Sequence, residues 1–294
     1  MENTNIPSAS YKEMKLPEPK YIVSEDKHKY SIVLPTGETI GPLKSVTGAL
    51  GIIAKPALIA WSAREAANYF KTEILRLGRS ALDPAMLEQI SKDAAQAHRK
   101  KASDAADLGS TIHNVCEAII LGCEPESIPE EIKEALLAFK KWRLSSDIQI
   151  VATEIATGSV KYKYGGRIDA VGWSKDRGGF GIIDLKTSKS LLYGNEYSLQ
   201  VGGYAAAMAE QYGVDFSWAE IVRLGKAAPF TSEVRPVTDM AAAVDGFMAA
   251  LTLSNGAETR IIGEPSFTTE AAVHAPEKKS AVKSKDKIAP ALGF

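Results

Sequence analysis

Cysteine is nearly missing from this chain of 294 residues, which contains only Cys116 and Cys123. Two cysteines are too few for a tetrathiolate zinc site or an iron-sulfur cluster, and they do not suggest the disulfide framework of a secreted protein. The sequence therefore favours a protein of a reducing compartment.

A strong charge of one sign and long hydrophobic runs are also missing. The formal net charge is -1, which excludes a histone-like binder but is compatible with a local basic groove. No apolar run approaches the roughly 20 residues that span a bilayer, and the first residues lack the basic and apolar regions of a signal peptide. No G-x-x-x-x-G-K-[ST] phosphate-binding loop is present. We expect a soluble, cytoplasmic protein without a membrane partner and without its own motor.

The hydrophobic content of 45% is enough for a sizeable core. Residues 1–18 are polar and rich in proline, which predicts a flexible lead-in. Five lysines lie between Glu277 and Lys287 with few apolar neighbours, so residues 271–294 are expected to form a disordered basic tail. The remaining residues, 19–270, are expected to form a single domain.

The spacing of apolar residues changes along this domain from helical to alternating and back. The first part is predicted to be a small hairpin followed mainly by helices. Three short strands then form an antiparallel meander, and a helix, two strands and a final helix follow. The sequence therefore predicts an α/β fold with a central mixed sheet, flanking helices and a helical N-terminal portion. The predicted hairpin spans 20–40; the helices span 46–70, 104–121, 129–143, 196–212 and a stretch ending near 253; the strands span 148–156, 166–173, 179–186, 218–224 and 232–237.

Charged residues stand within two of the predicted strands. Alternation puts Asp184 and Lys186 on one face, and a hairpin would bring Asp169 of the preceding strand across from them. Carboxylates this close repel each other unless a cation is present, and hard oxygen ligands suit Mg²⁺ or Mn²⁺. Lys186 would then orient or deprotonate an attacking water. A surface ion network is the alternative, but the apolar flanks in R-I-D-A-V and I-I-D-L-K favour a site.

Three motifs in this region resemble those of a known family. G-G-R-I-D, I-I-D-L-K-T and Q-V-G-G-Y occur in the order of the G-x-x-D strand, the (D/E)-x-K strand and the Q-x-x-x-Y helix. These motifs are typical of the PD-(D/E)xK nuclease superfamily, in particular its RecB-like and phage exonuclease branch. Upstream, L-G-S-T-I-H-N-V-C-E is similar to the branch's G-T-x-x-H helix. The resemblance covers roughly Val46 to Tyr204 and implies a restriction-endonuclease-like core.

The resemblance implies a role for each matching residue. Asp169 and Asp184 would be acidic ligands of one or two Mg²⁺ or Mn²⁺ ions, and the backbone carbonyl of Leu185 would complete the coordination. Lys186 would position the nucleophilic water. His113 would approach a metal from the helical side, although a lone histidine at a helix-sheet boundary is more often structural.

Other residues are weaker candidates. Glu154 matches an acidic position frequent in the family, and Glu117 lies one helical turn after His113, where an ordinary polar helix position is an equal alternative.

Gln200 and Tyr204 share a helix face, and the resemblance assigns them to site support and nucleic-acid contact. A helix that packs Tyr204 onto the sheet would have the same spacing. Thr187 and Ser188 follow the catalytic lysine, where hydroxyl groups can hold phosphate oxygens. The basic stretch His98–Lys101 would line a strand-binding channel or form a solvated helix surface.

Taken together, the residues and the resemblance predict a Mg²⁺-dependent deoxyribonuclease, an exonuclease of phage or bacterial DNA recombination, repair or processing. Its partners would be DNA and a single-strand annealing or recombination protein. The four cysteines of the family's iron-sulfur members are missing, so no cluster is expected. The alternatives are a protein that binds DNA ends or single strands without cutting, and a structure-specific endonuclease.

Overall fold

The computed structural model describes residues 14–78, 83–123, 125, 127–188, 191, 195–225 and 232–258. The chain divides into two units, 1–258 and 259–294, of which only the first contains described residues. The expected lead-in is described only from Met14, and the expected tail at 271–294 lies outside the described residues.

Within the described part, six α-helices accompany one mixed sheet of eight strands, which confirms the predicted α/β fold with a central mixed sheet. None of the helices in these ranges is both long and apolar enough to cross a membrane. The strands are β1 (Ile22–Asp26), β2 (Lys29–Val33), β3 (Thr39–Ser45), β4 (Gln149–Ser159), β5 (Tyr164–Ser174), β6 (Gly179–Lys186), β7 (Phe216–Leu224) and β8 (Ser232–Pro236). The helices are α1 (Val46–Leu50), α2 (Pro56–Leu77), α3 (Pro84–Ile120), α4 (Lys133–Ser145), α5 (Asn195–Tyr212) and α6 (Met240–Glu258).

The central strand β5 has an interrupted edge. β4 pairs antiparallel with β5 over nearly its whole length and occupies one edge. The other edge is shared, because β3 pairs with Tyr164 and Gly165 at one end and β6 pairs with residues 170–174 at the other. Residues 166–169 therefore have no backbone partner on this edge among the described strands. The sheet continues from β6 to β7 in parallel and from β7 to β8 antiparallel.

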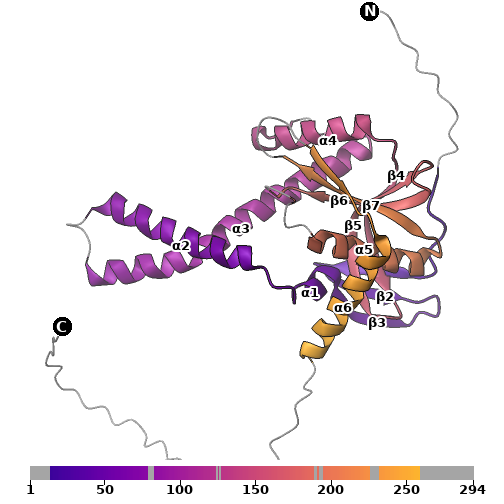
Figure 1. Ribbon diagram of the computed structural model, residues 1–294, viewed down its shortest axis with the longest axis horizontal. Helices are drawn as coiled ribbons and strands as arrows, with labels where there is room; N and C mark the ends of the chain where they lie inside the picture. Colours follow the sequence, from indigo (N-terminus) through magenta and orange to yellow (C-terminus); the bar gives the residue numbers. More distant parts are fainter. Residues whose placement is uncertain are drawn as a thin grey trace, which may run out of the picture. The chain divides into compact units, whose positions relative to one another are not determined.

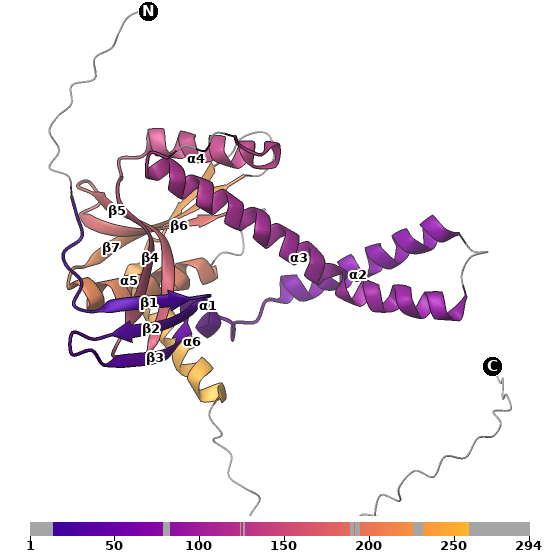
Figure 2. The same cartoon turned by 180° about the vertical axis from the view of Figure 1, so that it is seen from behind.

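Helices cover both faces of the sheet (Figures 1 and 2). On one face α1, α5 and α6 pack on alternate residues of β5, β6 and β7, with Tyr164 and Phe247 in edge-to-face contact at 4.7 Å. On the other face α4 and the C-terminal part of α3 bury residues such as Phe139, Trp142 and Ile183. This two-sided burial explains why β6 is mostly apolar, with Asp184 and Lys186 as the two charged residues that require an explanation.

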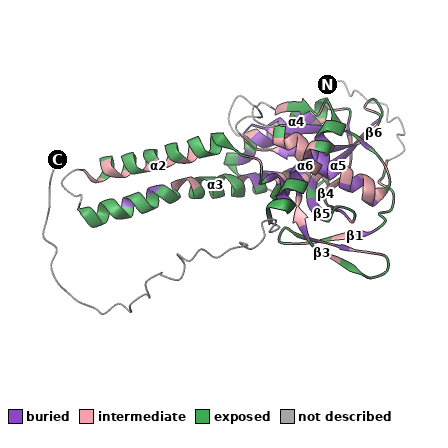
Figure 3. Ribbon diagram, turned by 60° about the horizontal axis from the view of Figure 1, so that its bottom comes forward, coloured by how far each residue is buried: buried purple, intermediate pink, exposed green. Residues whose placement is uncertain are grey.

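Helices α2 and α3 form an antiparallel hairpin, and most of α2 and the first half of α3 are exposed (Figure 3). The sequence predicted one helix over 46–70, but the structure breaks it into α1 and α2. Gly51 caps α1 and Pro56 begins α2, because proline suits the first helical turn. The helix predicted over 104–121 is the second half of the longer α3, whose first half lacks a wide apolar face.

Most other predicted elements are confirmed, including the antiparallel meander β4-β5-β6 and the helix α5. The predicted hairpin over 20–40 is the first part of a three-stranded antiparallel unit that adds β3. The predicted helix over 129–143 begins as a 3₁₀ turn at Glu130–Ile132 before α4.

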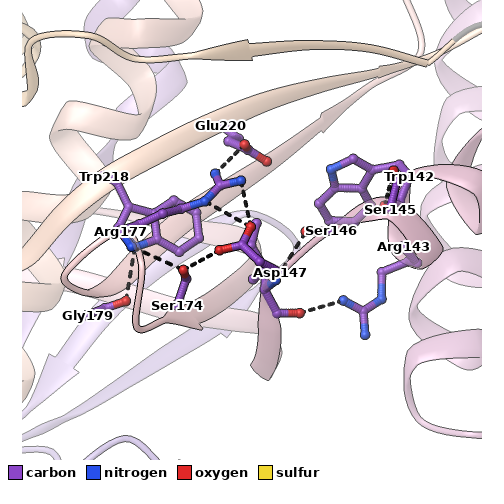
Figure 4. Close-up of polar contacts among 11 residues, drawn as sticks. Trp142, Arg143, Ser145, Ser146, Asp147, Ser174, Arg177, Gly179, Trp218 and Glu220 are labelled. Carbon is purple, nitrogen blue, oxygen red and sulfur yellow. Dashed lines mark hydrogen bonds and ion pairs between the residues drawn. The ribbon is translucent and has the colours of Figure 1, made fainter. Parts of the chain in front are cut away.

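An ionic clamp fixes the β5-β6 turn (Figure 4). Arg177 in this turn binds Asp147 through Nη2 at 2.9 Å, binds Glu220, and lies over the Trp218 ring at 5.0 Å. Ser174 Oγ donates to Asp147 Oδ2 at 2.5 Å. The clamp holds the register of the hairpin at its turn, and the opposite end of the hairpin is where Asp169 and Asp184 lie.

Candidate metal centre

The three acidic candidates occupy neighbouring positions on three strands. The β4-β5 register places Glu154 opposite Asp169, because the pairs on either side are Thr153↔Ala170 and Ile155↔Ile168. Asp169 faces Asp184 one position beyond the last β5-β6 pair, Ala170↔Ile183. Here β5 loses its partner on the β6 side, so the side chains at this point are not enclosed by a continuous ladder. The sequence-based expectation that Asp169 and Asp184 lie opposite each other agrees with this register.

Side chains of α3, β4 and β5 converge at this position. The ligand atoms of His113, Glu154 and Asp169 all lie within 4.8 Å of one another. His113 Nδ1 is 3.3 Å from Asp169 Oδ1, and the amide N–H of Leu185 donates to Asp169 Oδ2 at 2.7 Å. The Asp169 carboxylate thus bridges the split between β5 and β6. Glu154 has a left-handed backbone with φ of 49°, which is strained for a residue other than glycine.

Asp184 and Lys186 form a second, more buried part of the site. The Asp184 side chain is only 3% exposed, and its Oδ2 atom lies 2.5 Å from Lys186 Nζ. That oxygen accepts no hydrogen bond of regular geometry from the described residues. Lys186 Nζ also lies 4.9 Å from the centre of the Tyr197 ring, a cation-π contact from α5. Asp184 is not one of the three residues whose ligand atoms cluster within 4.8 Å.

The pKa values of the two aspartates are shifted in opposite directions. Burial raises the pKa of Asp169, but the hydrogen bond and charge of His113 and the charge of Lys186 outweigh it and hold the pKa below its ordinary value. Burial raises the pKa of Asp184 to about 6, against the opposing charge of Lys186. The pKa of Lys186 is also raised, because the two carboxylates outweigh its burial. Lys186 is therefore an ammonium at neutral pH.

These residues fit a hard divalent cation. Burial, and after it the charge of Asp169, raises the pKa of Glu154, so a nearby cation would favour its ionised form. Burial also raises the pKa of Asp184, whose Oδ2 atom has no hydrogen bond of regular geometry from the described residues. Carboxylate oxygens with a single imidazole form a donor set that Mg²⁺ or Mn²⁺ accepts.

Two clefts open beside the site. One, of about 340 Å³, lies between the β1-β2 turn, the start of α1 and α5. The other, of about 300 Å³, lies along α3. Both clefts are lined by Arg167 and Asp169. The first is also lined by His28, Tyr30, Ser45, Val46, Thr47, Gly166, Gln200 and Tyr204, and the second by Ala105, Ala106, Gly109, Ser110, His113, Asn114, Glu154 and Thr187.

The weaker candidates fall at different distances from this centre. Gln200 and Tyr204 lie together as their spacing predicted, with Gln200 Nε2 donating to Tyr204 Oη at 3.0 Å, and both line the first cleft. Tyr204 also packs in the core, so both of its predicted roles are compatible with its position. Thr187 lines the second cleft, and Ser188 follows it half-buried at the strand exit.

Glu117 is turned toward β4, where Thr153 Oγ1 donates to Glu117 Oε1 at 3.5 Å, and it is not one of the three clustered ligands. The basic stretch His98–Lys101 lies on the exposed part of α3. There His98 packs against the Trp61 ring, with centroids 6.3 Å apart, and Lys101 Nζ pairs with Glu65 at 2.7 Å. These contacts agree with the interpretation of this stretch as a helix surface.

Two residues at the site were missed by sequence reasoning. Arg167 stands inside the quoted G-G-R-I-D motif, and its exposure on a buried strand could not be read from the motif. Tyr197 lies three residues before Gln200 on α5, and only the packing of α5 against the end of β6 brings it to Lys186.

Comparisons with known proteins add little to this geometry. No protein-family model and no curated protein sequence matches the chain. Among solved structures, one titled "Crystal structure of SSO0001" is similar over 50% of this chain and 68% of its own, with 17% sequence identity and a TM-score of 0.26.

Proposed function

We propose that this protein is a metal-dependent deoxyribonuclease of the PD-(D/E)xK type with a restriction-endonuclease-like core, and that it acts as an exonuclease. The observation that carries the proposal is the cluster of His113, Glu154 and Asp169 at the interrupted edge of β5, with the Asp184–Lys186 ion pair at the adjoining end of β6. We further propose that it acts on DNA in the cytoplasm of a bacterial or phage-infected cell, in recombination, repair or processing.

The chain's own residues would divide the work as follows. Asp169, Glu154 and His113 would hold Mg²⁺, with Asp184 as a further acidic ligand. When bound, the ion would polarise the scissile phosphate and make a water more acidic. Lys186 lies between Asp184 and Tyr197 at this site and would orient or deprotonate the attacking water.

The supporting residues hold this lysine in place. Asp184 fixes the ammonium from the strand side and Tyr197 from the helix side, so the Nζ atom has a defined direction. The clefts on both sides of Asp169 provide space for nucleotides before and after the scissile phosphate.

The direct test is a nuclease assay on end-labelled linear DNA and on closed circular DNA, with Mg²⁺ and with EDTA. An exonuclease degrades the linear substrate only, and EDTA stops it. Asp184→Ala and Lys186→Ala should abolish cleavage while circular dichroism shows a retained fold. Cleavage by Lys186→Ala at the parental rate would exclude the assigned role. DNA binding without cleavage in Mg²⁺ or Mn²⁺ would instead support the binding protein.

A further inference from the structure

Arg167 is the one exposed residue of β5. The other ten positions of this strand are buried or half-buried, whereas the Arg167 side chain is 43% exposed. Alternation places Arg167 on the same side of β5 as Asp169, about 7 Å along the strand. A charged side chain exposed beside a half-buried acidic cluster has a position that core packing does not explain.

Among the described residues, two carboxylates form ion pairs with the guanidinium. Its Nε atom lies 2.8 Å from Glu154 Oε2, and its Nη1 atom lies 3.7 Å from Glu25 Oε1. Glu25 in turn is 3.3 Å from His28 Nδ1 in the β1-β2 turn. Lys27 and His28 have left-handed backbones in this turn, with φ of 48° and 62°. The contacts connect the rim of the first cleft to the acidic cluster through Arg167.

Resting on the proposed nuclease function, we propose that Arg167 binds a backbone phosphate of the DNA next to the metal centre. Its position is suited to this because Arg167 lines both clefts, so that a DNA strand in either cleft would lie beside it. The planar guanidinium fork matches two phosphate oxygens, which a lysine does not.

Glu154 couples this phosphate contact to the metal. In the structure Glu154 neutralises Arg167, and it is also one of the three clustered ligands. If the Glu154 carboxylate held a cation, its attraction for the guanidinium would weaken and Arg167 would have donors free for phosphate. DNA binding and metal binding would then support each other.

The test is equilibrium binding of fluorescent single-stranded and duplex oligonucleotides to the full chain, with Ca²⁺ in place of Mg²⁺ and over a range of salt concentrations. Arg167→Gln should weaken binding about 10-fold or more. It should also reduce the slope of log affinity against log salt by about 0.7 for single strands or 0.9 for duplex, the value of one phosphate contact. Arg167→Lys should retain the slope but lower kcat/KM for cleavage by about 100-fold, because the fork is lost.

Arg76→Gln is the matched control. Arg76, like Arg167, pairs with a glutamate, here Glu73, but it lies near the end of α2 and lines neither cleft. This variant should bind DNA like the parent protein. An unchanged salt slope in a folded Arg167→Gln protein overturns the inference, even if the parent cuts DNA. A reduced slope with a parent protein that does not cut supports the inference and rejects the proposed activity instead.

Discussion

The most informative perturbation of this site is Lys186→Met, which removes the ammonium and keeps a straight side chain. Asp184 then loses the cation that lies 2.5 Å from it and remains a buried carboxyl group. Breaking a buried ion pair in this way costs about 3–5 kcal/mol. For a folded unit of this size, 1 kcal/mol corresponds to roughly 2–4 °C in Tm, so we expect a decrease of about 10 °C at pH 8 without metal.

The stability difference between Lys186→Met and the parent protein should depend on pH. Because the folded pKa of Asp184, about 6, exceeds its ordinary value of 3.8, the folded state holds this proton more tightly than the unfolded state. The contribution of Asp184 to the free energy of unfolding is therefore highest below about pH 4, and it is lost as the pH rises through about 6. Without the charge of Lys186 the pKa of Asp184 rises further. The stability of Lys186→Met should therefore continue to decrease at pH values where that of the parent no longer changes. At pH 5, where the carboxyl group is mostly protonated in both proteins, the difference should shrink to roughly 1 kcal/mol.

The assay is thermal unfolding in EDTA from pH 5 to pH 8, combined with cleavage of linear DNA in Mg²⁺, which should decrease about 10²–10⁴-fold. Lys133→Met is the control, because Lys133, exposed at the start of α4, pairs with Glu130 of the preceding 3₁₀ turn, and such surface pairs contribute little. Its unfolding curve should follow the parent at every pH. Parallel pH profiles for Lys186→Met and the parent would refute the assigned burial and pairing of Asp184.

Three further predictions test the metal, the packing and the cysteines. Titration with Mg²⁺ or Mn²⁺ should raise the Tm of the parent protein but not that of Asp169→Asn, since binding to the folded state alone stabilises it; equal increases would exclude Asp169 as a ligand. Gly181→Ala should destabilise the protein by about 1–3 kcal/mol in urea unfolding, because the added Cβ would lie 2.1 Å from the Trp218 ring; an unchanged midpoint would contradict this packing. A thiol reagent at pH 8 should label Cys123 rapidly, whereas Cys116 should react only on unfolding because burial raises its pKa to about 12; rapid labelling of both in mass spectrometry would disprove it.

Much of the fold could be predicted from the sequence because the patterns are local. The alternation in G-F-G-I-I-D-L-K determines that Asp184 and Lys186 share a face, and the turn-rich S-K-D-R-G-G makes the two flanking strands a hairpin. The break between α1 and α2 at Gly51 and the extension of α3 to Pro84 were not predicted, because neither end of these helices is marked by a change in hydrophobic period.

The site, like the fold, was determined partly by local sequence and partly by tertiary contacts. The sequence by itself determined which residue types were available, since carboxylates and a lysine between apolar neighbours must either pair with one another or bind a cation. Only the tertiary structure decided that β3 and β6 leave a gap on the edge of β5, and that α3 brings His113 to it. It also decided that Arg167 is exposed between two clefts. These facts depend on contacts between segments far apart in the chain, and no local pattern encodes the distance between them.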